Sequence, residues 1–388
     1  MVALRNISLS LSVFVELSIQ LSHSNLLADY YPIHMQHEAR PIQRQGQTLV
    51  PDSFGGIPIK RFSHTQFDLD ALLRRKGSTT ISACVPTLNE EATIGLVVQK
   101  LAELREVGLL DEVFVIDSGS LDRTREIAEG AGANVLLDYE ILPELGRAVG
   151  KGEAIFKGIA ASAGDIICWL DGDVVDFSER FVLGLVGPLL CDPDISFVKA
   201  YYKRPLSGAA KGLHAPEDRG PLDARIAQRA EIGEGGRVTE LTARPLLLHF
   251  FPALSVISQP LSGEYAGRRW LLERIPLDTG YGVDVGILID VFSLAGPDRI
   301  AECDLEIRHH RNRPLSDLAP MAAEVSYAIL RRVPEVRRAL AGYAQPLSYT
   351  PVYSKQLRLY QRPPVYTVKV KGGGEPVDES SAERVSDH

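Results

Sequence analysis

Residues 165–173 read DIICWLDGD, a short apolar run that ends in two carboxylates separated by one glycine. The length of the run and its β-branched residues predict a buried strand. Side chains two positions apart on a strand point the same way, so Asp171 and Asp173 can converge, and Gly172 permits a tight turn between them. Two carboxylates at the end of a core strand need a cation or hydrogen-bond donors. Hard oxygen ligands suit Mg²⁺ or Mn²⁺, so the stretch predicts a divalent metal that bridges a diphosphate.

Strand patterns alternate with helical patterns on both sides of this stretch. Strands are expected at 81–86, 113–117, 134–137, 165–170 and 195–202, with helices near 91–107, 122–132, 147–163 and 178–190. This alternation predicts an α/β fold, with a mostly parallel sheet flanked by helices. Right-handed crossovers place the loops that follow the strands at one edge of the sheet, where ligands bind.

The remainder of the chain is less regular. Residues 1–50 show no sustained period and are expected to form an irregular N-terminal arm. After residue 203 the sequence predicts a loop (205–220), a helix (222–233), a strand (304–308) and helices (316–345, interrupted at Pro334). Residues 346–388 are expected to form an extension, disordered from about 372, where Gly, Glu and Ser dominate.

Composition narrows the class of protein. The 388 residues include 42 Lys and Arg against 50 Asp and Glu, a net charge of −8 that disfavours binding to nucleic acid. No run of about 18 uncharged apolar residues occurs, so no membrane-spanning helix is expected. Residues 7–15 resemble the apolar part of a signal peptide, but alternating serines and Glu16 disfavour a cleaved signal. Four widely spaced cysteines match no zinc or disulfide pattern, which favours the reducing cytoplasm.

Polar residues follow the expected strands. After the first strand, Asn89 can cap the next helix, or the PTLNEE segment can form a base and ribose pocket. After the second strand, Asp117 is placed to accept hydrogen bonds from a ribose or base, while Ser120 and Asp122 can serve equally as helix caps. The segment around Lys151 (GKGE, 150–153) opens a helix and allows a phosphate to approach the backbone, although it lacks the P-loop spacing.

Two later segments carry clustered cations. Residues 308–313 (RHHRNR) favour a metal ligand plus an anion site, or a solvated basic loop. Residues 235–239 (GGRVT) combine open backbone N–H groups, a guanidinium and a hydroxyl, which suits a phosphate or carboxylate, or form a flexible loop.

These motifs together resemble a known family. VPTLNEE (85–91), VIDSGSLDRT (115–124), GKGEA (150–154) and the DGD triplet resemble GT-A type glycosyltransferases that use nucleotide sugars. Four further segments resemble the retaining glucosyl-3-phosphoglycerate and mannosyl-3-phosphoglycerate synthases: GEGGRVTELTARPLL (233–247), ISQPLSGEYAGRR (257–269), LDTGYGVDVGILID (277–290) and HHRNRPL (309–315). The resemblance covers roughly residues 50–345. It implies a GT-A, Rossmann-like fold, with a nucleotide-sugar-binding domain over 51–203 and an acceptor-binding, metal-completing part over 204–345.

The resemblance implies transfer of glucose or mannose, with retention, from a nucleoside diphosphate sugar to the 2-hydroxyl of 3-phosphoglycerate. The product would be a precursor of a compatible solute or polysaccharide, and the enzyme a cytoplasmic homodimer that needs Mg²⁺ or Mn²⁺. The implied nucleotide-sugar-binding residues are Pro86, Leu88, Glu90, Asp117, Ser118, Lys151, Asp171 and Tyr281. The implied metal ligands are Asp173 and His310, and the implied acceptor-binding residues are Gly236, Arg237, Thr239 and Asn312. The implied catalytic residues are Leu261, through its backbone carbonyl, Asp284 and Asp171.

One departure remains, together with three rival classes: an inverting glycosyltransferase, a sugar nucleotidyltransferase, which would need a GxGTR entry that is missing here, and a non-catalytic nucleotide-sugar binder. Asp284 stands where the glucosyl enzymes usually carry Glu, which leaves the sugar open. An inverting polyprenyl-phosphate or processive glycosyltransferase shares the PTLNEE and DGD segments. The processive enzymes require a QxxRW segment and membrane helices, whereas this chain has Ala266 at the Gln position before Arg269 and Trp270.

Overall fold

The computed structural model describes residues 59–203, 236–309, 315–340, 357 and 359–369. Several sequence expectations lie outside these residues: the N-terminal arm, the loop over 205–220, the helix over 222–233, the tail from 372, and the side chains of His310 and Asn312.

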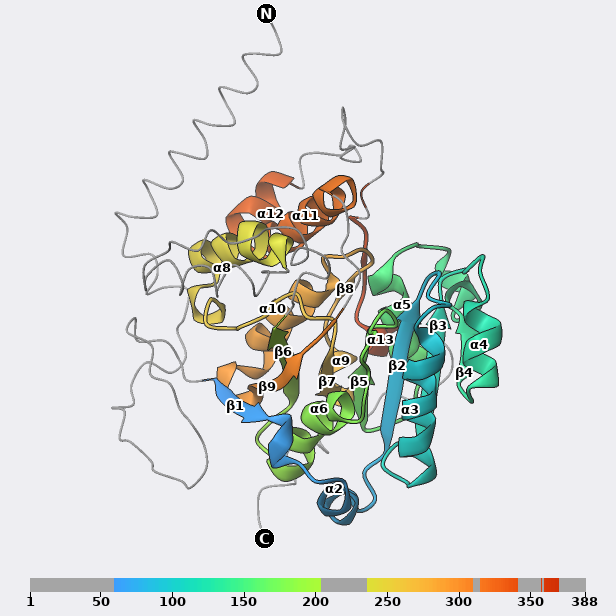
Figure 1. Cartoon of the computed structure of the whole chain (residues 1–388). Helices are drawn as coiled ribbons and strands as arrows, with labels where there is room; N and C mark the ends of the chain where they lie inside the picture. The colour runs from blue at the N-terminus through green and yellow to red at the C-terminus, as the bar shows by residue number, and fades with distance from the viewer. Residues whose placement is uncertain (1–58, 204–235, 310–314, 341–356, 358, 370–388) are drawn as a thin grey trace, which may run out of the picture. The chain divides into compact units, whose positions relative to one another are not determined.

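An eight-stranded sheet forms the centre of the fold, in the order β1-β9-β6-β7-β5-β2-β3-β4 (Figure 1). All neighbouring strands pair in parallel except β7, which is antiparallel to both β5 and β6. The predicted mostly parallel α/β fold is therefore confirmed. The strands are β1 (Lys60–Ser63), β2 (Ile81–Thr87), β3 (Glu112–Asp117), β4 (Asn134–Leu137), β5 (Ile166–Trp169), β6 (Phe197–Lys203), β7 (Tyr265–Arg268) and β9 (Ile300–Ile307).

Two of these strands come from the part of the chain after residue 203. β7 inserts between β5 and β6, and β9 pairs with β6 on one side and with β1 on the other. The expected division after residue 203 therefore does not separate two sheets. Neither β1 nor β7 was expected from the sequence, because each has only four residues and no clear alternation.

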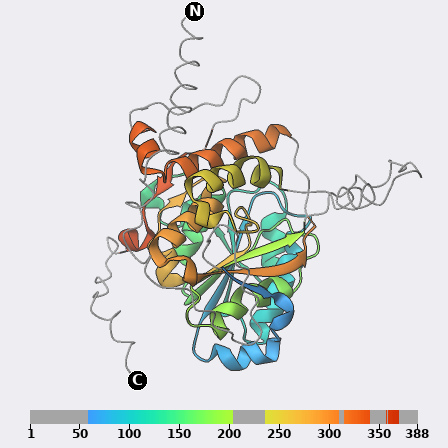
Figure 2. The same ribbon diagram turned by 90° about the vertical axis from the view of Figure 1, so that its left-hand side faces the viewer.

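Helices cover both faces of the sheet. The helices are α2 (Leu69–Lys76), α3 (Ile94–Glu106), α4 (Thr124–Gly130), α5 (Lys151–Ala161), α6 (Arg180–Cys191), α8 (Arg244–Phe250), α9 (Arg269–Leu272), α10 (Val283–Ala295), α11 (Leu315–Leu330), α12 (Pro334–Leu340) and α13 (Val365–Lys369). Figure 2 shows the sheet with the yellow and orange helices of the second half on one face and the blue α2 and light-green α6 on the other, while α5 lies on the same face as α10. A π-helical turn, η5 (Thr239–Ala243), leads into α8, and the 3₁₀ turns are η2 (His64–Gln66), η3 (Asp138–Glu140), η4 (Pro143–Leu145), η6 (Pro252–Leu254) and η7 (Pro297–Arg299).

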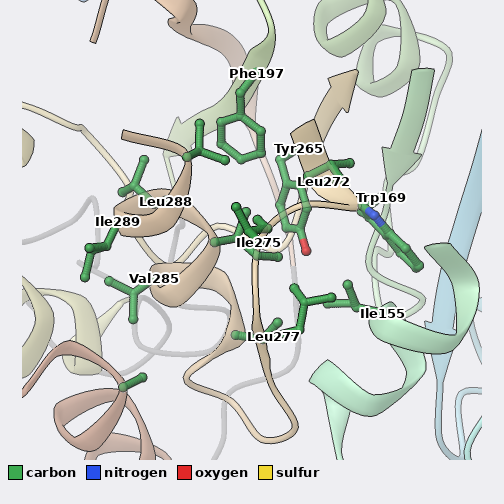
Figure 3. Close-up of a cluster of buried hydrophobic side chains, with 14 of the residues drawn as sticks. Ile155, Trp169, Phe197, Tyr265, Leu272, Ile275, Leu277, Val285, Leu288 and Ile289 are labelled. Atoms are coloured by element: carbon green, nitrogen blue, oxygen red, sulfur yellow. The ribbon is translucent and has the colours of Figure 1, made fainter. Parts of the chain in front are cut away.

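The core lies in two layers, one on each face of the sheet. On β5, Trp169 faces the layer that contains α5 and α10, while Cys168 faces the layer that contains α3 and α6. Adjacent strand residues point to opposite faces, so one apolar run such as IICW supplies both layers. Figure 3 shows the first of these layers, where Trp169 and Tyr265 from the sheet meet Ile155 of α5 and Val285 of α10.

Residues 359–369 of the C-terminal extension pack against the rest of the chain. β10 (Gln361–Arg362) pairs with β8 (Leu277–Asp278) in a second, antiparallel two-stranded sheet, and α13 packs on α5. The predicted interruption of the last long helices at Pro334 is confirmed, since α12 begins there. Among the described residues, no helix is both long and apolar enough to span a bilayer.

Candidate active site

The carboxylates of the DGD triplet converge directly after β5. Arg308, at the end of β9, joins them: its Nη2 lies 3.0 Å from Asp171 Oδ2 and 2.7 Å from Asp173 Oδ1. Its Nε lies 2.8 Å from Glu264 Oε1, a charge contact without hydrogen-bond alignment. Arg308 is 3% exposed. Burial opposes its charge, but Glu264 and the two aspartates hold its pKa above the ordinary value.

Lys151 connects the DGD triplet to a third aspartate. It opens α5 after Gly150, and its Nζ lies 2.9 Å from Asp171 Oδ1 and 3.0 Å from Asp284 Oδ2. Burial would lower the pKa of Lys151, yet the two carboxylates raise it above its ordinary value. Lys151 is therefore protonated at neutral pH and ready to neutralise an anion.

Asp284, in the first turn of α10, has one occupied and one unoccupied oxygen. Oδ2 accepts from Lys151, while the buried Oδ1 has no hydrogen-bond partner among the described residues. Burial raises the pKa of Asp284, although Lys151 and Lys199 oppose the shift. A buried acceptor without a donor is costly, and the hydroxyl of a bound ligand would satisfy it.

A tight turn at residues 259–264 closes over these charges. A Cβ atom on Gly263 would lie 2.3 Å from both Asp171 Oδ1 and Lys151 Nζ, so any other residue would displace these two charged groups. The turn places Leu261, which is half-buried, beside the same network. Glu264 ends the turn. Its second oxygen, Oε2, accepts a short hydrogen bond from the Tyr202 hydroxyl, while Oε1 contacts Arg308.

A second lysine lies underneath the turn. Lys199 of β6 is fully buried, and its Nζ donates to the Ser262 carbonyl at 2.8 Å and lies 5.0 Å from the centre of the Tyr265 ring. Burial lowers the pKa of Lys199 to about 8, with Asp284 opposing the shift.

Within the described ranges, the carboxylates of this network outnumber its cations, so a further cation would balance its charge. Four carboxylates (Asp171, Asp173, Glu264 and Asp284) face three cations (Lys151, Lys199 and Arg308) among the described residues. Both DGD carboxylates already converge on one cationic group, and their oxygens are the ligand type that Mg²⁺ and Mn²⁺ prefer. The residues present therefore fit a divalent metal, although the described residues contain no cluster of three His, Cys, Asp or Glu.

The loops after β2 and β3 hold each other through reciprocal hydrogen bonds. Asn89, at a φ of 59°, accepts from the Leu121 amide at 2.8 Å and donates its own amide to Ser120 Oγ at 2.9 Å. Asn89 therefore does not cap α3, and that interpretation of the sequence is wrong. Asp122 accepts from the Thr124 amide at 3.0 Å, but Arg123 is the residue that precedes α4 and it makes no side-chain capping hydrogen bond, so the cap interpretation of Asp122 is not confirmed.

Asp117 supports this pair of loops from below. It is fully buried, and it accepts from the amides of Gly119 and Ser120 at 2.9 and 2.8 Å. Those two amides bind Oδ1, while Oδ2 accepts from the hydroxyls of Ser120 and Thr87. Both carboxylate oxygens therefore have partners within the protein. The loops therefore present their outer residues, and the implied binding residues Pro86, Leu88, Glu90 and Ser118 are all half-buried or exposed.

The segment implied to bind the acceptor begins a helical stretch. Gly236 has a φ of 93°, and Arg237 opens a helical run that continues through η5 into α8. Arg237 is exposed and Thr239 is buried, with Thr239 Oγ1 3.6 Å from the position of a Cβ on Gly236. Tyr281 lies just before α10, and its amide donates to Glu324 of α11 at 2.8 Å.

Three charged residues of the network were not singled out from the sequence. Arg308 was treated only as one of a basic run, and Glu264 only as part of a motif. Lys199 had a signal of its own, because it is the one charged residue within the apolar run ISFVKAYY (195–202).

The chain resembles known proteins over most of its length. Residues 82–232 match the model of Glycosyl transferase family 2. A relative named glucosyl-3-phosphoglycerate synthase, from Petrotoga mobilis, is 45% identical over 71% of this chain and 81% of the relative.

Solved structures extend this likeness to three dimensions. A crystal structure of glucosyl-3-phosphoglycerate synthase from Mycobacterium tuberculosis, in complex with Mn²⁺, UDP-glucose and phosphoglyceric acid, has a TM-score of 0.66 and 38% identity. It covers 78% of this chain and 95% of that one. Another structure of the same enzyme, with Mg²⁺ and UDP, has a TM-score of 0.67 and 36% identity over 79% of this chain and 98% of that one. Since these relatives share 36–45% of their residues with this chain over 71–79% of its length, and the fold agrees, this chain belongs to the glucosyl-3-phosphoglycerate synthase family of metal-dependent glycosyltransferases.

Proposed function

We propose that this chain transfers glucose from UDP-glucose to the 2-hydroxyl of 3-phosphoglycerate and releases UDP, with retention of configuration. One observation carries the proposal: Lys151 lies between a carboxylate of the DGD triplet and Asp284, whose second oxygen is buried with no partner in the part of the chain that the structure describes. Lys151 therefore lies between two sites. The DGD side suits a diphosphate with its metal, and the second, buried oxygen of Asp284 suits a hydroxyl of the sugar that is linked to that diphosphate.

The bond that breaks joins the sugar to the diphosphate. Asp173, together with His310, would hold Mg²⁺ or Mn²⁺, which neutralises charge on the departing diphosphate. Lys151 adds a second, buried positive charge beside the same group. Removal of one such stabiliser typically lowers the rate about 10²–10³-fold.

The sugar lies, in this proposal, between Asp284, Tyr281 and the turn at 259–264. Asp284 Oδ1 accepts from a sugar hydroxyl, and the Leu261 carbonyl faces the anomeric carbon. The acceptor oxygen attacks from the side of the departing diphosphate, and its proton passes to a diphosphate oxygen. The buried turn excludes water, which would otherwise compete as the acceptor.

The acceptor carries a phosphate and a carboxylate, so its site needs cations and open N–H donors. The first turn of the helical run at Arg237 offers both, because the first amides of a helix have no partner within it. Gly236 allows close approach of the backbone, Thr239 adds a hydroxyl, and Asn312 completes the site.

We favour glucose over mannose because the relative and the solved structures named above are glucosyl enzymes. Asp284 nevertheless has a shorter side chain than the Glu that glucosyl enzymes usually carry at this position.

We further propose that the enzyme is a cytoplasmic homodimer. All four cysteines are unpaired, as in a reducing compartment. Leu241 of η5 and Leu248 of α8 are 79% and 56% exposed, so they do not pack into the core. A second copy of the chain would cover these apolar side chains.

A donor panel tests the proposal. UDP-glucose, GDP-glucose and GDP-mannose would each be offered with 3-phosphoglycerate and either Mn²⁺ or Mg²⁺, and a polyprenyl phosphate would replace the acceptor in a parallel series. We expect UDP-glucose with 3-phosphoglycerate to be the best pair and chelation of the metal to stop turnover. Preference for GDP-mannose would overturn the sugar assignment, and transfer to the polyprenyl phosphate alone would overturn the acceptor.

A further inference from the structure

A buried arginine near the C-terminus lies outside every function considered so far. Arg362 of β10 is 3% exposed, and its guanidinium forms a bidentate pair with Glu153, at 2.9 Å from Nε and 2.8 Å from Nη2. The remaining donors reach two backbone carbonyls, Leu145 and Gly146, each at 2.8 Å. We call residues 359–369, which contain β10 and α13, the C-terminal clasp.

The groups that Arg362 holds flank Lys151 along the chain. Leu145 and Gly146 belong to the loop that leads into α5, and Glu153 is in the first turn of α5, two residues after Lys151. The loop turns at two glycines, since Gly146 and Gly150 have φ values of 69° and 138°, which side chains rarely adopt. Arg362 therefore fixes both the approach to α5 and its first turn.

The clasp also holds the segment that leads to Asp284. The Tyr360 carbonyl accepts from both the amide and the hydroxyl of Thr279, at 3.0 and 3.1 Å. Thr279 in turn accepts from the Glu153 amide at 3.1 Å. A Cβ on Gly152 would lie 1.8 Å from the Asp278 carbonyl oxygen, so α5 and β8 are in direct backbone contact.

A buried ion pair is a weak source of stability, because apolar residues of the same volume would serve as well. Its directional hydrogen bonds, in contrast, define one geometry. From these contacts we infer that Arg362 is a positioning residue, through which the C-terminal clasp sets the placement of Lys151 and of the segment before Asp284 for the donor diphosphate sugar. The identity of the donor rests on the proposed function, while the placement itself does not.

The test compares Arg362→Lys and Arg362→Met with Arg338→Met, a matched control. The side chain of Arg338 is 77% exposed in α12, near the same end of the chain. Lysine can pair with Glu153 but cannot reach both carbonyls at once. We expect both Arg362 variants to raise the KM for UDP-glucose, and the Kd for UDP with Mn²⁺ by calorimetry, about 10-fold or more. The KM for 3-phosphoglycerate should stay within about twofold, and the control should match the wild type.

Hydrogen exchange provides a readout independent of turnover. Amides of 144–154 and 277–284 should exchange faster in the Arg362 variants, while those of β3 should not change. If the Arg362 variants fail to fold, Glu153→Gln takes their place with the same expectations. A lower melting temperature with unchanged UDP affinity, or faster exchange throughout the sheet in every variant, would show a purely structural role and overturn the inference. If the wild type fails to use 3-phosphoglycerate, the proposed function fails, while the UDP titration and exchange still decide this inference.

Discussion

Replacing Arg308 by methionine removes the cation that joins Asp171, Asp173 and Glu264. Glu264 is fully buried and Arg308 is 3% exposed, so this pair belongs to the class of buried ion pairs. Breaking such a pair from one side typically costs about 3–5 kcal/mol, because the other charge stays buried without compensation. The side chains of Asp171 and Asp173 are each 21% exposed and recover some hydration, so the cost arises mainly at Glu264. At roughly 2–4 °C per kcal/mol, the melting temperature should fall by roughly 6–20 °C.

A double-mutant cycle separates this cost from lost packing. Arg308→Met, Glu264→Gln and the double variant would each be unfolded in urea without metal, with the free energy of unfolding as the measured quantity. We expect the double variant to be more stable than the sum of the single losses predicts, by about 1–3 kcal/mol. Mn²⁺ should raise the melting temperature of Arg308→Met more than that of the wild type, because the guanidinium no longer occupies the DGD carboxylates. A loss below about 1 kcal/mol in Arg308→Met, or strict additivity in the cycle, would refute the argument.

Three further predictions concern the network and the proposed acceptor site. Asp173→Ala should lower kcat about 10²–10³-fold with the fold intact by circular dichroism, and activity within threefold of the wild type would exclude the metal assignment. Arg237→Ala should reduce kcat/KM for 3-phosphoglycerate by roughly 10–150-fold, since a charge-assisted hydrogen bond contributes about 1.5–3 kcal/mol. Calorimetry should show unchanged UDP-glucose affinity in that variant, whereas lost donor affinity with a normal acceptor KM would place Arg237 in the other site. In the folded protein the pKa of Lys199 is about 8, below its value in the unfolded chain. Between about pH 8 and pH 10 the unfolded state therefore binds more protons than the folded state, so the contribution of Lys199 to the free energy of unfolding rises with pH over this range. Lys199→Met should lose that rise in urea titrations across this range, and an unchanged pH dependence would contradict the assignment.

The sequence by itself predicted the α/β order between residues 81 and 203. The reason is that strand and helix periods are local, so DIICWL or ISFVKAYY shows its structure without knowledge of its neighbours. Asp171 and Asp173 were also predicted to converge, and they do, but the strand ends at Trp169 and the two carboxylates meet in the turn that follows it, where both contact Arg308.

Local pattern was less informative where a segment has few residues or several possible partners. β1 and β7 have four residues each, and their place in the sheet depends on β9, β5 and β6, which lie far away in sequence. Asn89 matched a helix cap by composition, but its side chain reaches Leu121 across to the next loop.

Only the tertiary structure brought Arg308, Glu264 and Lys199 to the DGD triplet and Arg362 to Glu153. Arg308 lies 137 residues from Asp171 along the chain, and Arg362 lies 209 residues from Glu153. A charged residue has no preferred partner in sequence, since an ion pair depends on where two strands or helices end in space. The order of the strands decides those positions, and with it which cations meet which carboxylates.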